Sequence, residues 1–231
     1  MVIATLHVFG IRRVQLARAM AHVATDRFSL GRTSGLHFAK LLGTGSGESF
    51  TLRDADLQHW ARFAVWHDAA AAAAYDRCDV WTRFAGETMR VELAPTRAHG
   101  CWSGRDPFAS TRGGFEPVAT EAPAGGIAVL TRARVHLRKW RAFVAATPPV
   151  AAVLNDTPGL RFSIGVGEAP IGLQGTFSLW DSNSAMEQFA YGSAPHRDVM
   201  SRTRQEQWYA EEMFARFAVR SIDGTFNGQT L

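Results

Sequence analysis

Apolar positions along the chain follow two periods, and segments of each period succeed one another in a regular order. Residues 58–66 alternate as a strand does, and residues 14–24 carry apolar side chains at helical spacing. Asp68 stands directly before an Ala-rich run and is a suitable N-cap for a helix there. The predicted elements of the first part of the chain are a strand at 2–9, a helix at 14–24, strands at 36–42 and 58–66, a helix at 69–74 and a strand at 89–94.

The second part of the chain repeats this order. Its predicted elements are a strand at 126–134, a helix at 137–146, strands at 160–166 and 172–180, one long helical stretch from 183 to about 215, and a strand at 216–222. Three segments also match in sequence between the two parts: 3–6 with 127–130, 36–43 with 160–167, and 63–66 with 177–180. Because the three matches come in the same order, we interpret them as an internal duplication.

The order strand, helix, strand, strand, helix, strand is that of the ferredoxin-like unit. Its helices cover one face of an antiparallel sheet, so the other face has to be buried elsewhere. Two units can bury both free faces by packing sheet against sheet. We therefore predict an α+β barrel made of tandem duplicated ferredoxin-like units: residues 1–96, a connecting loop at 97–125 that lies over a pocket, and residues 126–231.

Composition and charge narrow the class of protein without identifying it. Apolar residues make up 46% of the chain, and the formal net charge is +4. The basic residues are scattered, which argues against a nucleic-acid binder. The two cysteines do not have the number or spacing of a zinc site or a disulfide framework. No signal-peptide pattern and no apolar run of membrane-spanning length is present, so we expect a cytoplasmic protein, with peripheral contact to a membrane left open.

Several residues of the second part carry a resemblance to a known family. They are Phe177-Ser178-Leu179-Trp180, Met186, Phe189-Ala190-Tyr191, His196 and the segment 208–217, with support from 38–45, 64–66 and 100–102 in the first part. Through them the chain resembles the spheroidene monooxygenase family over nearly its whole length. The resemblance implies a haem-dependent monooxygenase that converts a methylene group of an acyclic carotenoid to a keto group by successive hydroxylations, with electrons from a ferredoxin-type donor.

Other functions stay open beside this one. Haem also occurs on barrels of this kind in dye-decolourising peroxidases, chlorite dismutases and aldoxime dehydratases, which is an analogy at the level of the fold. One alternative is therefore a haem dehydratase or peroxidase that acts on a different lipophilic substrate. A further alternative is a ferredoxin-like protein without a cofactor that binds a small apolar molecule.

His196 is the leading candidate for the axial ligand of the haem iron that the resemblance implies. Ser193 is a suitable N-cap before it, and Pro195 suits the first helical turn. The N-terminus of a helix disfavours a cation, so the imidazole should be neutral, the form that binds iron. Met200 lies one turn later on the same predicted face. The alternative ligands are Cys101 as a thiolate and four histidines in or near predicted strands: His7, His37, His59 and His136.

Four residues of the first part are candidates for holding the propionates of that haem. Lys40 lies in an apolar predicted strand before a Gly-rich stretch. Thr44 and Gly45 in that stretch could bind an anion through exposed amides, and Arg62 on the next strand is a further candidate. The alternative is an ordinary hairpin turn, with Lys40 extending to solvent.

Aromatic side chains are expected to line an apolar cavity between the two sheets, as a long polyene substrate requires. The candidates for substrate contact are Trp66, Phe177 and Trp180. The duplication places Trp66 and Trp180 at matching positions, so we also expect them in equivalent surroundings. Ordinary core packing would explain most of the other aromatic residues.

Overall fold

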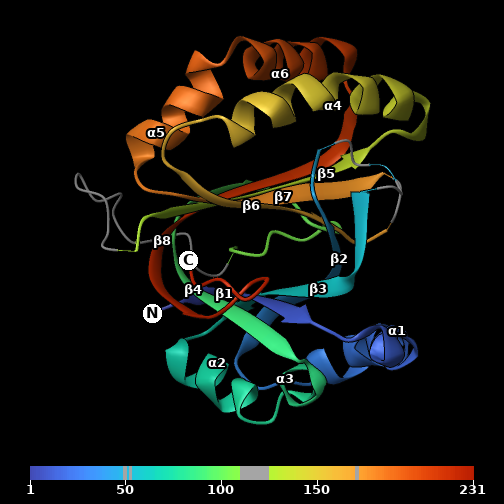
Figure 1. Ribbon diagram of the computed structural model, residues 1–231, viewed down its shortest axis with the longest axis vertical. Coiled ribbons are helices and arrows are strands. Elements are labelled where there is room, and N and C mark those ends of the chain that lie inside the picture. The colour runs from blue at the N-terminus through green and yellow to red at the C-terminus, as the bar shows by residue number, and fades with distance from the viewer. Residues whose placement is uncertain (49–50, 52–53, 110–124, 170–171) are drawn as a thin grey trace.

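A computed structural model describes residues 1–48, 51, 54–109, 125–169 and 172–231 of the chain. A closed barrel of strands lies at the centre, and the helices lie outside it in two groups at opposite ends of the long axis (Figure 1). The predicted α+β barrel is confirmed. Among the described residues, no helix is both long and apolar enough to cross a membrane.

The first half of the barrel has the predicted order of elements. They are β1 (Ile3–Gly10), the 3-10 turn η1 (Arg13–Gln15), α1 (Leu16–Leu30), β2 (Leu36–Gly45), β3 (Ala55–Trp66), α2 (Ala69–Asp76), α3 (Val80–Phe84) and β4 (Glu87–Gly100). The Asp68 carboxylate accepts a hydrogen bond from the backbone N–H of Ala71, which confirms the predicted N-cap of α2. Beyond residue 96 the chain continues as part of β4, and residues 110–124 of the predicted loop lie outside the described residues.

The second half repeats these elements and adds a π-helical segment. They are β5 (Ile127–Val135), η4 (Leu137–Lys139), α4 (Trp140–Asn155), β6 (Leu160–Gly167), β7 (Leu173–Trp180), α5 (Asn183–Glu187), the π-helical segment η5 (Gln188–Gly192), α6 (Ala194–Glu206) and β8 (Tyr209–Gly224).

The single helical stretch predicted from 183 to about 215 is wrong. The helical segments end at Glu206, and Gln207 stops the last one with a left-handed backbone (φ 50°). From Tyr209 the chain is a strand, in which Met213 and Phe217 point into the barrel core. The segment contains many residues with high helix propensity, so its alternation of inward and outward positions, which is typical of a strand, was not recognised from the sequence.

The strand order β1-β3-β2-β6-β7-β5-β8-β4 shows the duplication directly. Each half contributes four strands in the same relative order, and the halves join along two seams. One seam is long and joins β4 to β8, whereas β2 and β6 pair only at Gly43–Gly45 with Gly165–Gly167. A Cβ atom at Gly165 would lie 2.8 Å from the backbone of Gly47. The Gly-rich stretch, predicted as an anion-binding loop, therefore lies largely within β2, where it closes the barrel.

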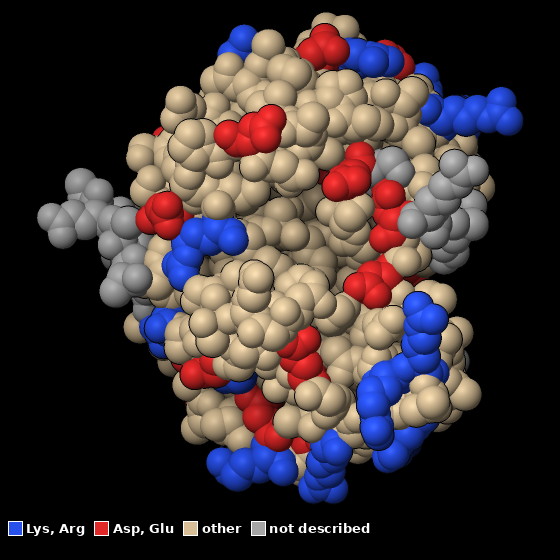
Figure 2. Space-filling model, in the orientation of Figure 1, with Lys and Arg blue, Asp and Glu red and all other residues tan. Residues whose placement is uncertain are grey.

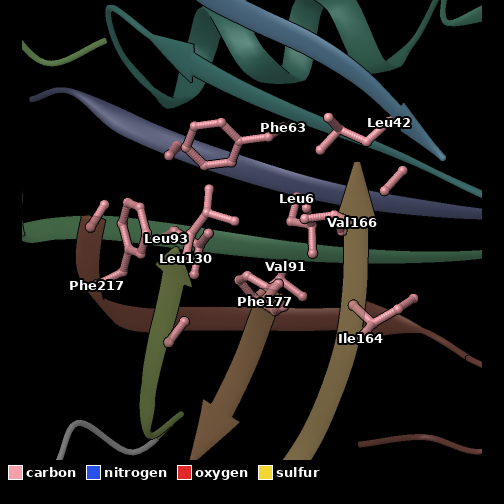
Figure 3. Packing of buried hydrophobic residues seen from close by; sticks show 14 of the residues in the cluster. Leu6, Leu42, Phe63, Val91, Leu93, Leu130, Ile164, Val166, Phe177 and Phe217 are labelled. Atoms are coloured by element: carbon pink, nitrogen blue, oxygen red, sulfur yellow. The ribbon is translucent and has the colours of Figure 1, made fainter. Parts of the chain in front are cut away.

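The interior of the barrel is filled by apolar side chains from both halves. Leu6, Phe63 and Leu93 come from the first half and meet Leu130 and Phe177 from the second (Figure 3). Phe177 is 0% exposed and points into this core as predicted. Around these positions side chains of both halves form one core cluster, so the apolar cavity expected between the two sheets stays a prediction.

Trp66 and Trp180 occupy equivalent positions, but on the opposite face of the sheet from Phe177. Trp66 is opposite Ile3, and Trp180 is opposite Ile127, in matching registers. Both rings are buried under helices, Trp66 beneath α2 and Trp180 beneath α5. The prediction that they line a cavity between the sheets is wrong, because both faces of each sheet are buried and alternation alone does not identify the inner one.

Candidate functional site

His196 lies at the start of α6, as predicted. Its backbone N–H donates to the Oγ of Ser193, which confirms the N-cap. The ring nitrogen Nδ1 lies 2.8 Å from the carbonyl oxygen of Ala190 in the π-helical segment η5. A carbonyl only accepts, so Nδ1 carries the proton and the neutral ring presents the lone pair of Nε2. This is the tautomer of a histidine that binds a metal through Nε2.

Burial reinforces the neutral form of this imidazole. The ring is largely removed from solvent, and this burial lowers the pKa of His196 below its ordinary value, although the hydrogen bond to Ala190 opposes the effect. Among the described residues, Nε2 of His196 makes no hydrogen bond. The nitrogen that could bind iron is therefore uncommitted at neutral pH.

Aromatic rings connect His196 to the sheet. The Phe189 ring lies 4.8 Å from the His196 ring, and Trp180 lies 5.6 Å from Phe189, measured between ring centroids. Trp180 thus contributes to the surroundings of His196 from the helix-covered face. Met200 is half-buried one turn beyond His196. These contacts give His196 an apolar environment between α6, η5 and the sheet.

Arg216 on β8 is a buried cation on this same face that the sequence analysis missed. It is 6% exposed, and its Nη1 donates to Asn183 and Glu187 of α5. Its Nη2 contacts the sulfur of Met186, and its Nε has no partner in the described part of the chain. The alternation of residues 213–217 would have placed Arg216 opposite the core face if the strand had been recognised.

A groove of about 520 Å³ opens at the far end of α6. Its lining residues are His136, Thr203, Arg204, Gln207, Tyr209, Ala210, Glu211 and Glu212. His136, a weaker ligand candidate, thus lies at the opposite end of α6 from His196. We therefore take the groove as a feature separate from the surroundings of His196.

Lys40 is not brought together with His196. It shares the inner face of β2 with Phe38 and Leu42, whereas His196 lies outside the barrel. Its Nζ is 2.8 Å from Oε2 of Glu168, which also accepts hydrogen bonds from Trp102 and Arg132. Burial alone would raise the pKa of Glu168, but these donors hold it below its usual range. Lys40 therefore joins the two halves through Glu168 instead of extending to solvent, and it lies apart from His196, with which it was predicted to hold one haem.

Arg62, Thr44 and Gly45 also lie apart from His196. Arg62 is 0% exposed beneath the helices of the first half, where its Nη2 lies 2.8 Å from Oδ2 of Asp79. The Thr44 hydroxyl donates to the carbonyl of His59, and Gly45 packs against the backbone next to β3. The prediction that these residues gather around one cofactor with His196 is wrong, because they are distributed over both faces of the first half.

The alternative ligands are committed elsewhere or isolated. His7 is buried against Asp76, His59 pairs with Asp56, and the His37 ring lies 6.0 Å from that of His67. Cys101 is a half-buried free thiol. Within the described ranges, no group of three or more His, Cys, Asp or Glu residues could hold a metal ion.

Comparison with known proteins gives close relatives along most of the chain. The spheroidene monooxygenase of Rhodobacter capsulatus is 33% identical over 214 residues, which cover 91% of this chain and 86% of that protein. That of Rubrivivax gelatinosus is 33% identical, covering 88% and 78%. That of Cereibacter sphaeroides is 36% identical over 83% of this chain, but the match spans only 58% of its own length. No protein-family model matches the chain.

Solved structures share the fold at low sequence identity. An aldoxime dehydratase aligns with 94% of this chain and 81% of its own, at a TM-score of 0.59 and 12% identity. An aldoxime dehydratase in complex with butyraldoxime aligns over the same share of this chain at a TM-score of 0.57 and 11% identity. At these identities the similarity shows a common fold and nothing about the reaction.

Proposed function

This chain belongs to the spheroidene monooxygenase family, and from that membership we propose that it is a haem-dependent monooxygenase acting on an acyclic carotenoid. The reaction converts a methylene group to a keto group. Each hydroxylation places one atom of O₂ into a C–H bond, and the other atom leaves as water after uptake of an electron pair and protons from a ferredoxin-type donor system. A second hydroxylation at the same carbon gives a geminal diol, which loses water to leave the ketone.

The observation that carries the haem proposal is the state of His196. Its Nδ1–H is held by the Ala190 carbonyl, its Nε2 is uncommitted, and burial keeps the ring neutral. The donor set therefore fits a group with one axial imidazole ligand. Bound haem would supply an iron centre at which O₂ is reduced and activated.

The residues around His196 have defined parts in this proposal. The hydrogen bond from Nδ1 to Ala190 orients the ring and increases its basicity as a ligand. Phe189, which packs against the His196 ring, and Trp180, which packs against Phe189, shield the ring from water. Met200, half-buried one turn along α6, would add apolar surface for the haem. Arg216 offers a buried guanidinium with one unpaired N–H on this same face, which suits a carboxylate such as a propionate.

Titration of purified protein with haemin tests the ligand. Wild-type protein should develop the Soret band of a histidine-ligated haem, and His196→Ala should lose it. Added imidazole should restore the band in His196→Ala by supplying the missing nitrogen, a result that a merely unfolded variant would not give. The control is His136→Ala, a half-buried histidine at the other end of α6, which should bind haem as wild type does.

Three results would count against parts of this proposal. An unchanged spectrum in His196→Ala would remove His196 as ligand. Failure of the wild type to bind haemin would instead favour the protein without a cofactor that binds a small apolar molecule. If haem binds, co-expression with the enzymes that make an acyclic carotenoid should yield a ketocarotenoid by mass spectrometry. Absence of that product would favour a haem enzyme of another kind.

A further inference from the structure

Helix α1 is apolar on its buried side and also on a side that is exposed to solvent. Leu16, Ala19 and Val23 contact the cluster around Phe9 and Trp81, at the spacing expected for the buried face of a helix. A helix on the surface of a globular protein normally carries polar residues on its other side. Here the other side is apolar as well, and it includes most of the periodic apolar positions that predicted this helix.

The outward-facing apolar positions form one continuous surface, which we call the α1 stripe. It consists of Val14, Ala17, Met20, Ala21, Ala24 and Phe28, all of them exposed. Val14 is 86% exposed, Met20 55% and Phe28 63%. Large apolar side chains exposed along one helix face, rather than scattered singly, mark a surface that is covered by something else.

The charge around the α1 stripe is strongly positive. The segment from residue 12 to residue 32 contains five arginines and a single acid, Asp26. Asp26 is occupied within the protein by Trp81 and His22. Figure 2 shows Lys and Arg side chains gathered over α1 at the lower right of the molecule. Five positive charges against one negative give this short segment a formal charge of +4, as large as that of the whole chain.

We propose that the α1 stripe docks on a membrane surface that contains anionic lipids. A helix that places Phe and Met in the acyl boundary and Arg beside the headgroups is the arrangement of an interfacial helix. Arginines near the surface add attraction to anionic headgroups. The inference rests on the exposure and charge of the α1 stripe, and it holds whether or not the reaction proposed above is correct.

The charge of the stripe argues against two other occupants. In a symmetric dimer the same surface faces itself, so arginines would meet arginines across the interface. An acidic electron-donor protein would match the charge of the α1 stripe. Under the function proposed above, however, its electrons would have to reach the haem held at His196. Helices α1 and α6 lie at opposite ends of the barrel (Figure 1), so a donor on α1 would be remote from that residue. A lipid surface matches both the apolar side chains of the α1 stripe and the arginines around it.

Flotation of the purified chain with vesicles tests the proposal without any carotenoid. Vesicles of phosphatidylglycerol mixed with phosphatidylcholine should bind the protein, and vesicles of phosphatidylcholine alone should bind it at least tenfold more weakly. Added salt should weaken binding by screening the arginines. Phe28→Ser should reduce the partition coefficient by about tenfold, and Met20→Ser with Phe28→Ser by about a hundredfold.

A matched control lies on the other half of the molecule. Leu137 is 78% exposed in η4, so Leu137→Ser removes a similarly exposed apolar side chain away from α1 and should leave binding unchanged. Because Met20, Phe28 and Leu137 are all more than half exposed, serine at these positions should not disturb folding. Circular dichroism checks this for each variant. Equal flotation of the double variant and wild type, or equal loss in Leu137→Ser, overturns the proposal.

Two further results would assign the α1 stripe to another partner and likewise overturn the proposal. One is a wild-type dimer in light scattering that the double variant converts to a monomer. The other is a chain that stays unbound with anionic vesicles at low salt but binds an acidic ferredoxin through Met20 and Phe28.

Discussion

The helix-covered faces of the two halves have the same strand register, but charged side chains occupy positions in the first half where the second half has neutral ones. In the first half β1 and β3 place His7 opposite Arg62, and at the matching position in the second half β5 and β7 place Thr131 opposite Thr176. Arg62 is buried with a carboxylate at 2.8 Å, whereas the two threonine hydroxyls bond to each other at 2.8 Å. One half therefore buries charge where the other has half-buried neutral groups.

The difference extends to the neighbouring positions. Arg90 lies opposite His7 in the first half, and Phe214 lies opposite Thr131 in the second. Tyr75 packs against Trp66 as Phe189 packs against Trp180. Before its last strand the second half has η5 and the longer helix α6, with His196, where the first half has the short helix α3. At these positions the first half is thus filled by its own ion pairs, whereas the second half has neutral side chains and carries its buried cation, Arg216, elsewhere on the same face.

The largest expected effect concerns the buried ion pair of the first half. Asp79→Asn keeps the N-cap of α3 but removes the carboxylate from Arg62, which would leave a fully buried guanidinium without its closest counter-ion. The free energy of unfolding should fall by about 3 kcal/mol. Urea unfolding measures this loss, and Asp68→Asn, which changes the N-cap of α2 without uncovering a buried charge, should cost much less. A loss of similar size in both variants would contradict a structural role for the charge pair.

A pair of matching glycines tests how closely the halves correspond. Gly35 and Gly159 have φ of 74° and 85°, and a Cβ there would lie 2.6 Å from Ala71 and 2.7 Å from Ala185. Alanine at either position should reduce the free energy of unfolding by about 1–2 kcal/mol from the left-handed backbone, with a further cost from the contact. Gly104→Ala separates the two causes, because its φ is also positive but no atom lies within 4 Å. Clearly unequal losses at the two matching positions would break the equivalence.

The smallest effect is a difference in acid sensitivity between the two buried histidines. Burial lowers the pKa of His7, the positive charge of Arg62 lowers it further, and Asp76 opposes both effects. Burial also lowers the pKa of His196. A folded-state pKa below the unfolded value means that the folded protein takes up the proton less readily. Stability in the absence of haem should therefore be unaffected above about pH 6.5, fall as the pH drops below it, and level off below the folded pKa.

Thermal unfolding followed across this pH range separates the two contributions. His7→Gln should flatten the acid-side decline more than His196→Gln, because His7 is 4% exposed and His196 is only partly buried. A larger flattening in His196→Gln would show that the second half, rather than the first, carries the main acid-sensitive group.

Local signals in the sequence predicted much of the architecture and one part of the site. The duplicated strand order is confirmed, as are the caps at Asp68 and Ser193 and the position of His196 at a helix start. These features depend on residues close together in the chain or on repeated segments. The boundary near Gln207 was wrong because helix propensity and strand period compete there, and the tertiary pairing of β8 decides the outcome.

The sequence by itself determined the duplication, the order of elements and a neutral imidazole placed at a helix N-terminus. Only the tertiary structure decided which face of each strand meets the barrel core, and so sent Lys40 inward to Glu168, Arg62 outward to Asp79 and Trp180 toward Phe189. The physical reason is that both faces of every sheet are buried here, so an apolar alternation looks the same from either side. Which face holds a site then depends on contacts between residues far apart in the chain.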